Sequence, residues 1–180
     1  MTKFSIIIPC RDDQAGLDRA VRSVLDQTVR DLEVIVVDDG SETPMRVLDE
    51  GRVRLIRRDT AGGPAAARNL GLDHADGQIV GWCDSDDFFT RNRLELAQRL
   101  HSDADIAIVG QGGASGRNSP TSVSSSLAHV LDRFNPHLGA TTVRRELCLP
   151  LDENFLACED IEWWIRMIEQ GGSFRSDSEV

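Results

Sequence analysis

Leu32-Glu33-Val34-Ile35-Val36-Val37-Asp38-Asp39-Gly40-Ser41 is the stretch that decides the fold. It begins with a nearly continuous apolar run over 32–37, rich in β-branched residues, and such a run indicates a strand that is buried on both faces. The run ends in two aspartates followed by glycine and serine, a combination typical of a turn. A buried strand with an acidic end predicts a parallel sheet that carries polar side chains along one edge.

Strand-like apolar runs and helix-like amphipathic stretches alternate on both sides of this segment. Apolar residues spaced three and four apart indicate helices, and short β-branched runs indicate strands. We expect strands at 4–9, 53–56, 78–83 and 104–109, helices at 44–50, 65–75, 93–100 and 159–170, and a first helix that Asp12 or Asp13 caps and that reaches Leu25. This alternation over residues 1–110 predicts an α/β fold with a mostly parallel sheet flanked by helices on both faces.

The length and composition fit one globular domain. The chain has 180 residues, 40% of them hydrophobic, which is enough to bury a core. The 20 Lys and Arg residues are outnumbered by 30 Asp and Glu residues, so the formal net charge is −10. This balance argues against binding of nucleic acid, whose recognition depends on clustered cations, and against a basic membrane-binding patch.

The sequence also bears on location. No apolar run approaches the roughly 20 residues of a transmembrane helix, and the apolar stretch at 4–9 is too short for a signal peptide. We therefore expect a cytoplasmic protein without a transmembrane segment, and peripheral contact with a membrane is left open. No two of the four cysteines have the close spacing of a zinc knuckle or a redox pair, so we expect reduced and mostly buried thiols.

Acidic clusters follow two of the expected strands. Asp38-Asp39 follows the strand at 32–37, and Asp84-Ser85-Asp86-Asp87 follows the strand at 78–83. In an open α/β sheet, ligands bind beyond the carboxyl ends of the strands, so both clusters are expected to face one crevice. Carboxylates in turns often only cap helices, but two clusters gathered together need a cation or a cationic partner to offset their repulsion. Mg²⁺ or Mn²⁺ is the natural choice, because these ions prefer oxygen ligands and bridge to substrate phosphates.

The expected substrate is therefore a nucleoside diphosphate compound. Arg68, on the helix after Gly62-Gly63-Pro64, is a candidate partner for its phosphates, and a surface arginine is the alternative. The Rossmann fingerprint is missing after the first expected strand, where Pro9-Cys10-Arg11-Asp12 stands instead of glycines. The sequence also lacks a Walker A motif and a nucleophile elbow.

Five motifs occur in an order that is typical of one known family. They are the strand that ends at Pro9, Asp38-Asp39-Gly40-Ser41, Gly62-Gly63-Pro64-Ala65-Ala66-Ala67-Arg68-Asn69-Leu70-Gly71, Asp84-Ser85-Asp86-Asp87 and Glu159-Asp160. Together they resemble the inverting family 2 glycosyltransferases, which have the GT-A fold. The resemblance covers residues 4–172. It implies a single GT-A domain over 1–180, with a Rossmann-like nucleotide-binding half at 1–110 and a small acceptor-side half at 111–180.

The resemblance implies a role for each residue of the donor site. Asp39 is expected to accept a hydrogen bond from the base, commonly uracil, and Asp84 is expected to contact the ribose or its surroundings. Pro9 and Arg11 are expected to form part of the floor under the nucleotide. Asp86 is expected to be the metal ligand that holds Mg²⁺ or Mn²⁺ against the diphosphate.

The late acidic pair is expected to act on the acceptor. Asp160 resembles the general base that takes a proton from the acceptor hydroxyl, and Glu159 is expected to orient or tune it. Simple capping of the helix at 159–170 is the alternative interpretation. The sequence does not specify whether the acceptor is a glycan, a lipid-linked molecule or a small molecule.

Two features depart from the family pattern. The family usually has a Tyr-Asn pair two and three residues after the proline of the first strand, whereas this chain has Arg11 and Asp12 there and contains no tyrosine. The chain ends at Val180, soon after the helix expected at 159–170, so we expect either a minimal acceptor side or a truncated one. The Gln-x-x-Arg-Trp motif of processive synthases is absent, as in the members that add a single sugar.

We therefore expect a metal-dependent glycosyltransferase that moves a sugar from a nucleoside-diphosphate sugar, with UDP as the preferred nucleotide, to an acceptor hydroxyl with inversion. A nucleotidyltransferase and a non-catalytic relative that only binds nucleotide sugars are the alternatives. Residues 112–126 hold six serines and three glycines. This segment is expected either to order over the donor or acceptor or to be disordered.

Overall fold

A computed structural model of the chain describes residues 3–109, 137–155 and 157–177. The strands are β1 (Phe4–Cys10), β2 (Leu32–Asp39), β3 (Val53–Arg58), β4 (Ile79–Trp82), β5 (Ile106–Val109), β6 (Thr141–Arg144) and β7 (Phe174–Asp177). The helices are α1 (Gln14–Leu25), α2 (Pro64–Asp73), α3 (Arg93–Leu100) and α5 (Glu159–Glu169), with short 3₁₀ helices at Leu138–Ala140 and Arg145–Leu147. Of the two candidate caps, Asp13 is the one that caps α1, because its carboxylate accepts a hydrogen bond from the Gly16 amide at 2.9 Å.

The strands of the described residues form one seven-stranded sheet in the order β3-β2-β1-β4-β6-β5-β7. All neighbouring pairs are parallel except those of β6, which is antiparallel to both β4 and β5. This confirms the expected α/β fold with a mostly parallel sheet. The sequence pattern did not predict β6 or β7, because each has only four residues and mixes polar with apolar side chains.

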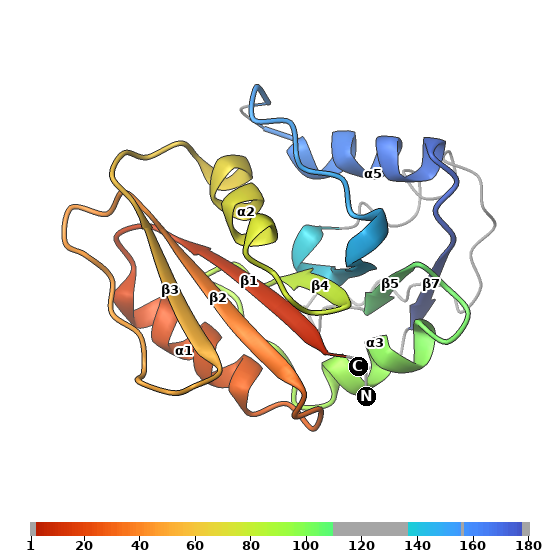
Figure 1. Cartoon of the computed structure of the whole chain (residues 1–180), viewed down its shortest axis with the longest axis horizontal. Coiled ribbons are helices and arrows are strands. Elements are labelled where there is room, and N and C mark those ends of the chain that lie inside the picture. The colour runs from red at the N-terminus through yellow and green to blue at the C-terminus, as the bar shows by residue number, and fades with distance from the viewer. Residues whose placement is uncertain (1–2, 110–136, 156, 178–180) are drawn as a thin grey trace.

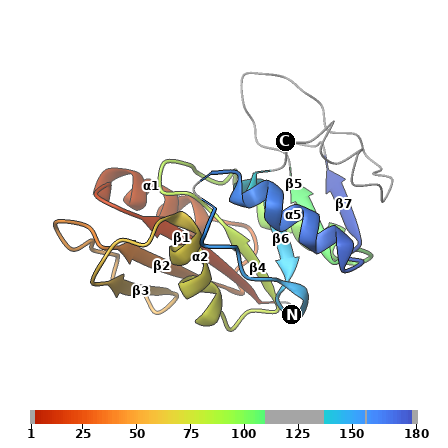
Figure 2. The same ribbon diagram turned by 90° about the horizontal axis from the view of Figure 1, so that it is seen from above.

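Side chains of β1 alternate between two buried layers. Phe4, Ile6 and Ile8 belong to an apolar cluster with α1 and α3, and Ile7 belongs to a second cluster with α2 and α5. Because successive residues of a strand point to opposite faces, a strand covered on both sides must be apolar at nearly every position. Figures 1 and 2 show the twisted sheet with these helices around it.

A series of aromatic rings fixes α5 on the sheet. Trp163 of α5 packs edge-on against Trp82 at the end of β4, with ring centroids 5.4 Å apart. Trp164 packs edge-on against Trp163 at 5.7 Å and against Phe174 of β7 at 6.2 Å. All four rings are buried, so they hold α5 against the strand that precedes the second acidic cluster.

The prediction of a helix at 44–50 is wrong. Residues 44–50 contain neither helix nor strand, although β2 and β3, which they connect, are parallel. The Met45 amide donates a hydrogen bond to Asp38 Oδ2 at 3.0 Å, and the Arg46 amide donates one to Gln14 Oε1 at 2.9 Å. These amides bind side chains from other elements instead of carbonyls of a helix, and local apolar spacing does not reveal such partners.

Asp38 is buried, and its carboxylate binds amides of the connection between β2 and β3. It accepts hydrogen bonds from the amides of Ser41 and Met45, each at 3.0 Å, and from the Arg57 guanidinium. Burial alone would raise the pKa of Asp38, but the hydrogen bonds outweigh burial and lower it. Asp38 is fully buried, whereas its neighbour Asp39 is 5% exposed.

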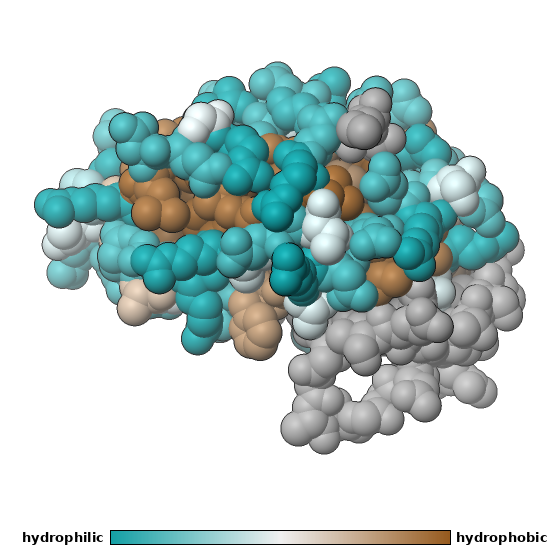
Figure 3. Space-filling model, turned by 90° about the horizontal axis from the view of Figure 1, so that it is seen from below, coloured by the Kyte–Doolittle hydropathy of each residue, from teal (hydrophilic) through white to brown (hydrophobic). Residues whose placement is uncertain are grey.

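One face of the molecule is largely polar. Figure 3 shows a face on which hydrophilic residues predominate and surround smaller hydrophobic areas. Within the described ranges, no helix is both long enough and apolar enough to cross a membrane. The segment 112–126, expected to close over a ligand or to be disordered, lies outside the described residues.

Candidate active site

The carboxyl ends of β1, β2 and β4 meet at one edge of the sheet. β1 pairs with β2 on one side and with β4 on the other, so the strand order reverses here, and open α/β sheets bind ligands at such a point. A cleft of about 310 Å³ lies at this edge. Its lining comes from four separate segments of the chain: Pro9, Cys10, Arg11, Asp39, Gly63, Pro64, Ala67, Arg68, Asp84, Ser85 and Asp86.

Asp39 joins the end of β2 to the start of α2. Its carboxylate accepts hydrogen bonds from the amides of Gly62 and Gly63, at 3.0 and 2.8 Å, and lies 3.1 Å from Nε of Arg58. Gly40 turns the chain directly after it, with a φ of 70°, and a Cβ there would lie 2.6 Å from a backbone nitrogen of the next loop. Asp39 is 5% exposed, so its orientation in the cleft wall is fixed by these partners.

Helix α1 holds the acidic turn 84–87 in place. Gly16 lies so close to this turn that a Cβ on it would be 2.5 Å from the carbonyl oxygen of Ser85. The Arg19 guanidinium donates a hydrogen bond to the carbonyl of Asp86. A 3.0 Å backbone hydrogen bond between the last and first residues of the turn closes it. The position of Asp86 therefore depends on α1 as well as on β4.

Three carboxylates, those of Asp84, Asp86 and Asp87, lie close together in this turn. Burial and the charges of Asp84 and Asp86 raise the pKa of Asp87. Arg68 pairs with Asp84, whereas no Lys or Arg of the described residues forms an ion pair with Asp86. This edge of the cleft therefore carries an excess of negative charge.

Arg68 of α2 joins the acidic turn to α5. Its Nη2 lies 2.8 Å from Asp84 Oδ1, and its Nη1 lies 2.9 Å from Glu159 Oε1. Burial alone would lower the pKa of Arg68, but the charges and hydrogen bonds of Asp84 and Glu159 raise it. At 7% exposure Arg68 is not a surface arginine, and it stays charged between its two carboxylates.

Asp160 lies beside Glu159 in the first turn of α5 and does not line the cleft. One of its carboxylate oxygens accepts a hydrogen bond from the Ile161 amide at 2.9 Å, and the other lies 3.8 Å from Nδ1 of His137. Cys158, at a left-handed φ of 63°, turns the chain into the helix just before this pair. The Asp160 side chain is 23% exposed and is therefore open to a small ligand from solvent.

The structure brings the predicted site residues to one region. Those expected to bind nucleotide and metal all line the cleft: Pro9, Arg11, Asp39, Arg68, Asp84 and Asp86. Glu159 reaches the cleft wall through its ion pair with Arg68, and Asp160 is the next residue along α5. Their individual roles stay predictions.

Several residues that shape the cleft were not predicted. In the register of β2 and β3, Arg57-Arg58 lies opposite Asp38-Asp39. Two basic residues directly after the strand expected at 53–56 could therefore have indicated these partners of the aspartates. Arg19 gave no such signal, because 67 residues of sequence separate it from the carbonyl of Asp86. Contacts of this kind depend on how α1 packs, and residue spacing does not encode them directly.

A divalent cation would find suitable ligands at this edge. Asp84 and Asp86 present carboxylates to the cleft, and Mg²⁺ and Mn²⁺ prefer oxygen ligands. Over the part of the chain that the structure describes, no group of three or more His, Cys, Asp and Glu side chains is arranged to hold a metal ion. The residues therefore fit a cation that takes its other ligands from water and from donor phosphates, which is the usual environment of Mg²⁺.

A larger hollow of about 830 Å³ lies between the start of α1 and residues 42–48. Asp12, Asp18 and Glu42 are among its lining residues, and none of the predicted nucleotide or metal residues lines it. We place the candidate site in the smaller cleft, because only there do the carboxyl ends of parallel strands converge.

Sequence comparison identifies the same family as the motifs. The sequence model of the family described as Glycosyl transferase family 2 matches residues 5–150. This range contains every residue that lines the cleft, and the pair Glu159-Asp160 lies beyond it.

Curated relatives match either most of the chain or its first part. The chain is 30% identical over 176 residues to UDP-Glc:alpha-D-GlcNAc-diphosphoundecaprenol beta-1,3-glucosyltransferase WfgD of Escherichia coli, a match that covers 92% of this chain and 69% of the relative. It is 39% identical over 101 residues to an uncharacterized glycosyltransferase of Haemophilus influenzae, covering 53% of this chain and 40% of that relative. The match with the Haemophilus protein thus spans less than half of that protein's length.

Solved structures share the fold. TarS 1-349 of S. aureus in complex with UDP-GlcNAc superimposes with a TM-score of 0.81 at 21% identity, covering 99% of this chain and 58% of that one. The mannosyltransferase PcManGT of Pyrobaculum calidifontis in complex with GDP-Man and Mn²⁺ gives a TM-score of 0.75 at 16% identity, covering 99% of this chain and 55% of that one. This likeness confirms the expected GT-A-like architecture.

Proposed function

The chain belongs to glycosyl transferase family 2, and from this premise we propose that it transfers a sugar from a nucleoside-diphosphate sugar to an acceptor hydroxyl, with inversion at the anomeric carbon. The observation that carries the proposal is the cleft at the strand ends, where four separate segments bring their polar side chains to one space. UDP is the nucleotide we propose, because WfgD is named for UDP-Glc and TarS is described in complex with UDP and UDP-GlcNAc.

In this proposal the residues 1–110 bind the donor. Asp39 accepts a hydrogen bond from the base, Asp84 contacts the ribose, and Pro9 and Arg11 form the floor of the cleft. Because the loop amides already orient Asp39, the base meets a carboxylate that needs no rearrangement. Asp86 would hold Mg²⁺ or Mn²⁺, which when bound neutralises the charge on the leaving diphosphate.

Residues 111–180 supply the acceptor side. Asp160 takes the proton of the acceptor hydroxyl while that oxygen forms a bond to the anomeric carbon and the bond between that carbon and the diphosphate breaks. The electron pair of the broken bond leaves with the diphosphate. Attack from the face opposite the diphosphate inverts the anomeric centre. Glu159, held by Arg68, orients the neighbouring base.

The acceptor class that we propose is a lipid-linked saccharide, because the name of WfgD specifies a sugar on diphosphoundecaprenol. Such an acceptor requires peripheral contact with a membrane. The cytoplasmic location stays a prediction.

A thermal-shift screen with UDP-, GDP- and dTDP-sugars, each with and without Mn²⁺, tests the donor. We expect UDP-sugars to raise the melting temperature more with Mn²⁺ than without it. In Asp86→Asn the Mn²⁺-dependent part of the shift should be lost, because one ligand is neutralised. The control is Asp73→Asn, which changes an exposed carboxylate at the end of α2 and should leave both shifts unchanged.

Asp160→Asn tests the chemistry separately. It should abolish sugar transfer while UDP binding survives, because Asp160 lies outside the cleft. Normal turnover of this variant would contradict the role of Asp160. Release of sugar 1-phosphate from the UDP-sugar, or of pyrophosphate when UTP is supplied with a sugar 1-phosphate, would indicate a nucleotidyltransferase. Donor binding with neither transfer nor slow hydrolysis of any donor sugar would indicate a non-catalytic relative.

A further inference from the structure

Arg68 is a buried cation with partners from two distant parts of the chain. Its partner Asp84 is 16 residues away in sequence, and its partner Glu159 is 91 residues away. The Arg68 side chain is 9% exposed, the Glu159 side chain 16% and the Asp84 side chain 37%. A guanidinium leaves water at this depth only if carboxylates compensate it, so the three groups are expected to move as one unit.

The two ion pairs occupy the two terminal nitrogens of Arg68. Nη2 binds Asp84 and Nη1 binds Glu159, while Nε is buried without a hydrogen-bond partner among the described residues. The planar guanidinium therefore fixes an angle as well as a distance between the acidic turn and the start of α5. A lysine would supply one point charge and could not keep both directions.

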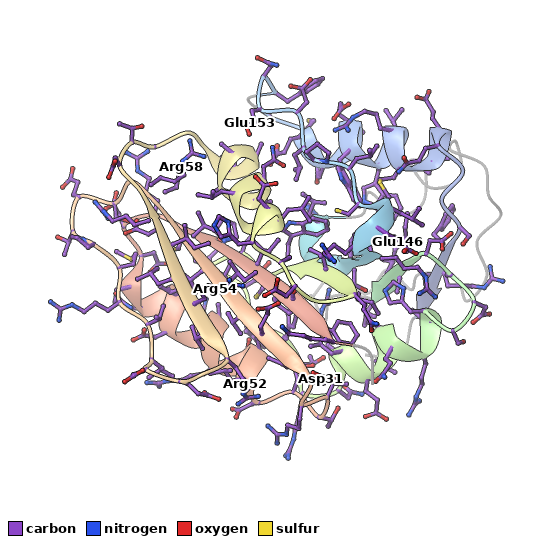
Figure 4. All side chains as sticks on the ribbon, viewed as in Figure 1. Asp31, Arg52, Arg54, Arg58, Glu146 and Glu153 are labelled. Atoms are coloured by element: carbon purple, nitrogen blue, oxygen red, sulfur yellow. The ribbon has the colours of Figure 1, made fainter. Side chains whose placement is uncertain are left out.

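Asn69, the next residue of α2, reaches the same part of the chain. Its Nδ2 donates to the Leu151 carbonyl at 2.9 Å and to Glu153 Oε1 at 2.9 Å, and its Oδ1 accepts from the Leu151 amide at 2.8 Å. Figure 4 labels Glu153 above α2. Helix α2 thus contacts two residues that precede α5, Leu151 and Glu153, and the first residue of α5, Glu159.

We propose that Arg68 is a positioning residue that sets the place of Asp160 relative to the donor cleft, acting through Glu159 on one side and Asp84 on the other. The proposal rests on the proposed function, in which Asp160 is the general base. It differs from a direct contact between Arg68 and the donor phosphates, because two carboxylates already balance the charge of the guanidinium.

The test uses Arg68→Met, Arg68→Lys and Glu159→Gln in the full chain. The matched control is Arg54→Met, because Arg54 also contacts two carboxylates, Glu33 and Asp76, but on the outer strand β3 (Figure 4). Arg68→Met should lower kcat about 100-fold, as expected when a reacting group is misplaced by about 1 Å. The Kd of UDP in the presence of Mn²⁺ should change by less than about threefold.

The double variant decides how Arg68 acts. If it acts through Glu159, Arg68→Met combined with Glu159→Gln should be no slower than Arg68→Met alone, because groups that act as a unit are not additive. Arg68→Lys should fold and should lose most of the rate, because its charge reaches one partner at a time. A large rise in the Kd of UDP at unchanged kcat would overturn the proposal in favour of a direct donor contact. Full activity of both Arg68 variants would also overturn it.

Hydrogen exchange tests the positioning without any need for transfer activity. Amides of residues 159–163 should exchange faster in Arg68→Lys than in the wild type, while amides of α1 should not change. Unchanged exchange at 159–163 would refute the positioning role. If these amides exchange faster in Arg68→Lys but the wild type itself transfers no sugar, the positioning role is kept and the proposed function is rejected.

Discussion

Replacing Gly16 by alanine should destabilise this protein, although the same change stabilises most helices. Gly16 is the third residue of α1, where glycine is about 1 kcal/mol less favourable than alanine. An added Cβ, however, would lie 2.5 Å from the carbonyl oxygen of Ser85 and still closer to the carboxylate of Asp13. Ordinary contacts between carbon and oxygen are longer, so the acidic turn and the cap must each retreat by roughly 0.5–1 Å.

The size of the effect follows from these two contacts. Loss of the Asp13 cap costs about 1 kcal/mol, and forcing a methyl group into a filled site costs about 1–3 kcal/mol. After the gain in helix propensity is subtracted, the free energy of unfolding should fall by about 1–3 kcal/mol. For a chain of this size the melting temperature should then fall by roughly 3–10 °C. The shifted turn carries Asp86, so the affinity for UDP with Mn²⁺ should fall about tenfold.

Differential scanning fluorimetry and calorimetric titration of UDP with Mn²⁺ measure both effects. Gly51→Ala is the control, because a Cβ on Gly51 meets no atom within 4 Å. This variant should melt at or slightly above the temperature of the wild type. If Gly16→Ala were as stable as the wild type, or more stable, the close packing of α1 against the acidic turn would be refuted.

Three further predictions concern single side chains. Asp39→Ala should lower the free energy of unfolding by about 1–3 kcal/mol in urea titrations, because it leaves two loop amides and Arg58 without their acceptor, and an unchanged midpoint would contradict this. Burial lowers the pKa of His101 to about 4, so below about pH 6.5 the unfolded chain binds a proton that the folded protein does not bind. About 2 kcal/mol of stability should therefore be lost between pH 7 and pH 5. This part of the pH dependence should vanish in His101→Asn and persist in His74→Asn, as measured by urea unfolding at the two pH values. Cys158, the one exposed cysteine of the described residues, should react first with a thiol reagent, and Cys158→Ser should remove that fast phase.

Much of the framework could be predicted from the sequence. The runs at 4–9 and 32–37 are apolar at nearly every position, and the structure places them in the middle of a sheet that is covered on both faces. The helix at 159–170 was predicted almost to its ends, because Trp163, Trp164 and Met167 mark one apolar face. These features depend on residues close together in sequence, where spacing alone carries the information.

The errors and omissions lie where distant contacts outweigh local pattern. Residues 44–50 show helical spacing, but their amides bind side chains of Asp38 and Gln14. The strand β6 has only four residues and pairs with β4 and β5 in the antiparallel direction, and nothing in its own sequence specifies those neighbours. Its formation depends on the gap between β4 and β5 that the rest of the fold leaves open.

By itself, then, the sequence determined the alternation of strands and helices, the acidic residues at the strand ends and the family to which the chain belongs. Only the tertiary structure decided that Asp38 turns inward while Asp39 faces the cleft, and that Arg68 lies buried between Asp84 and Glu159. The physical reason is that the apolar periodicity that indicates helices and strands is local in sequence. The position of a charge, in contrast, depends on which counter-charges, up to 91 residues away for Arg68, share its desolvated site.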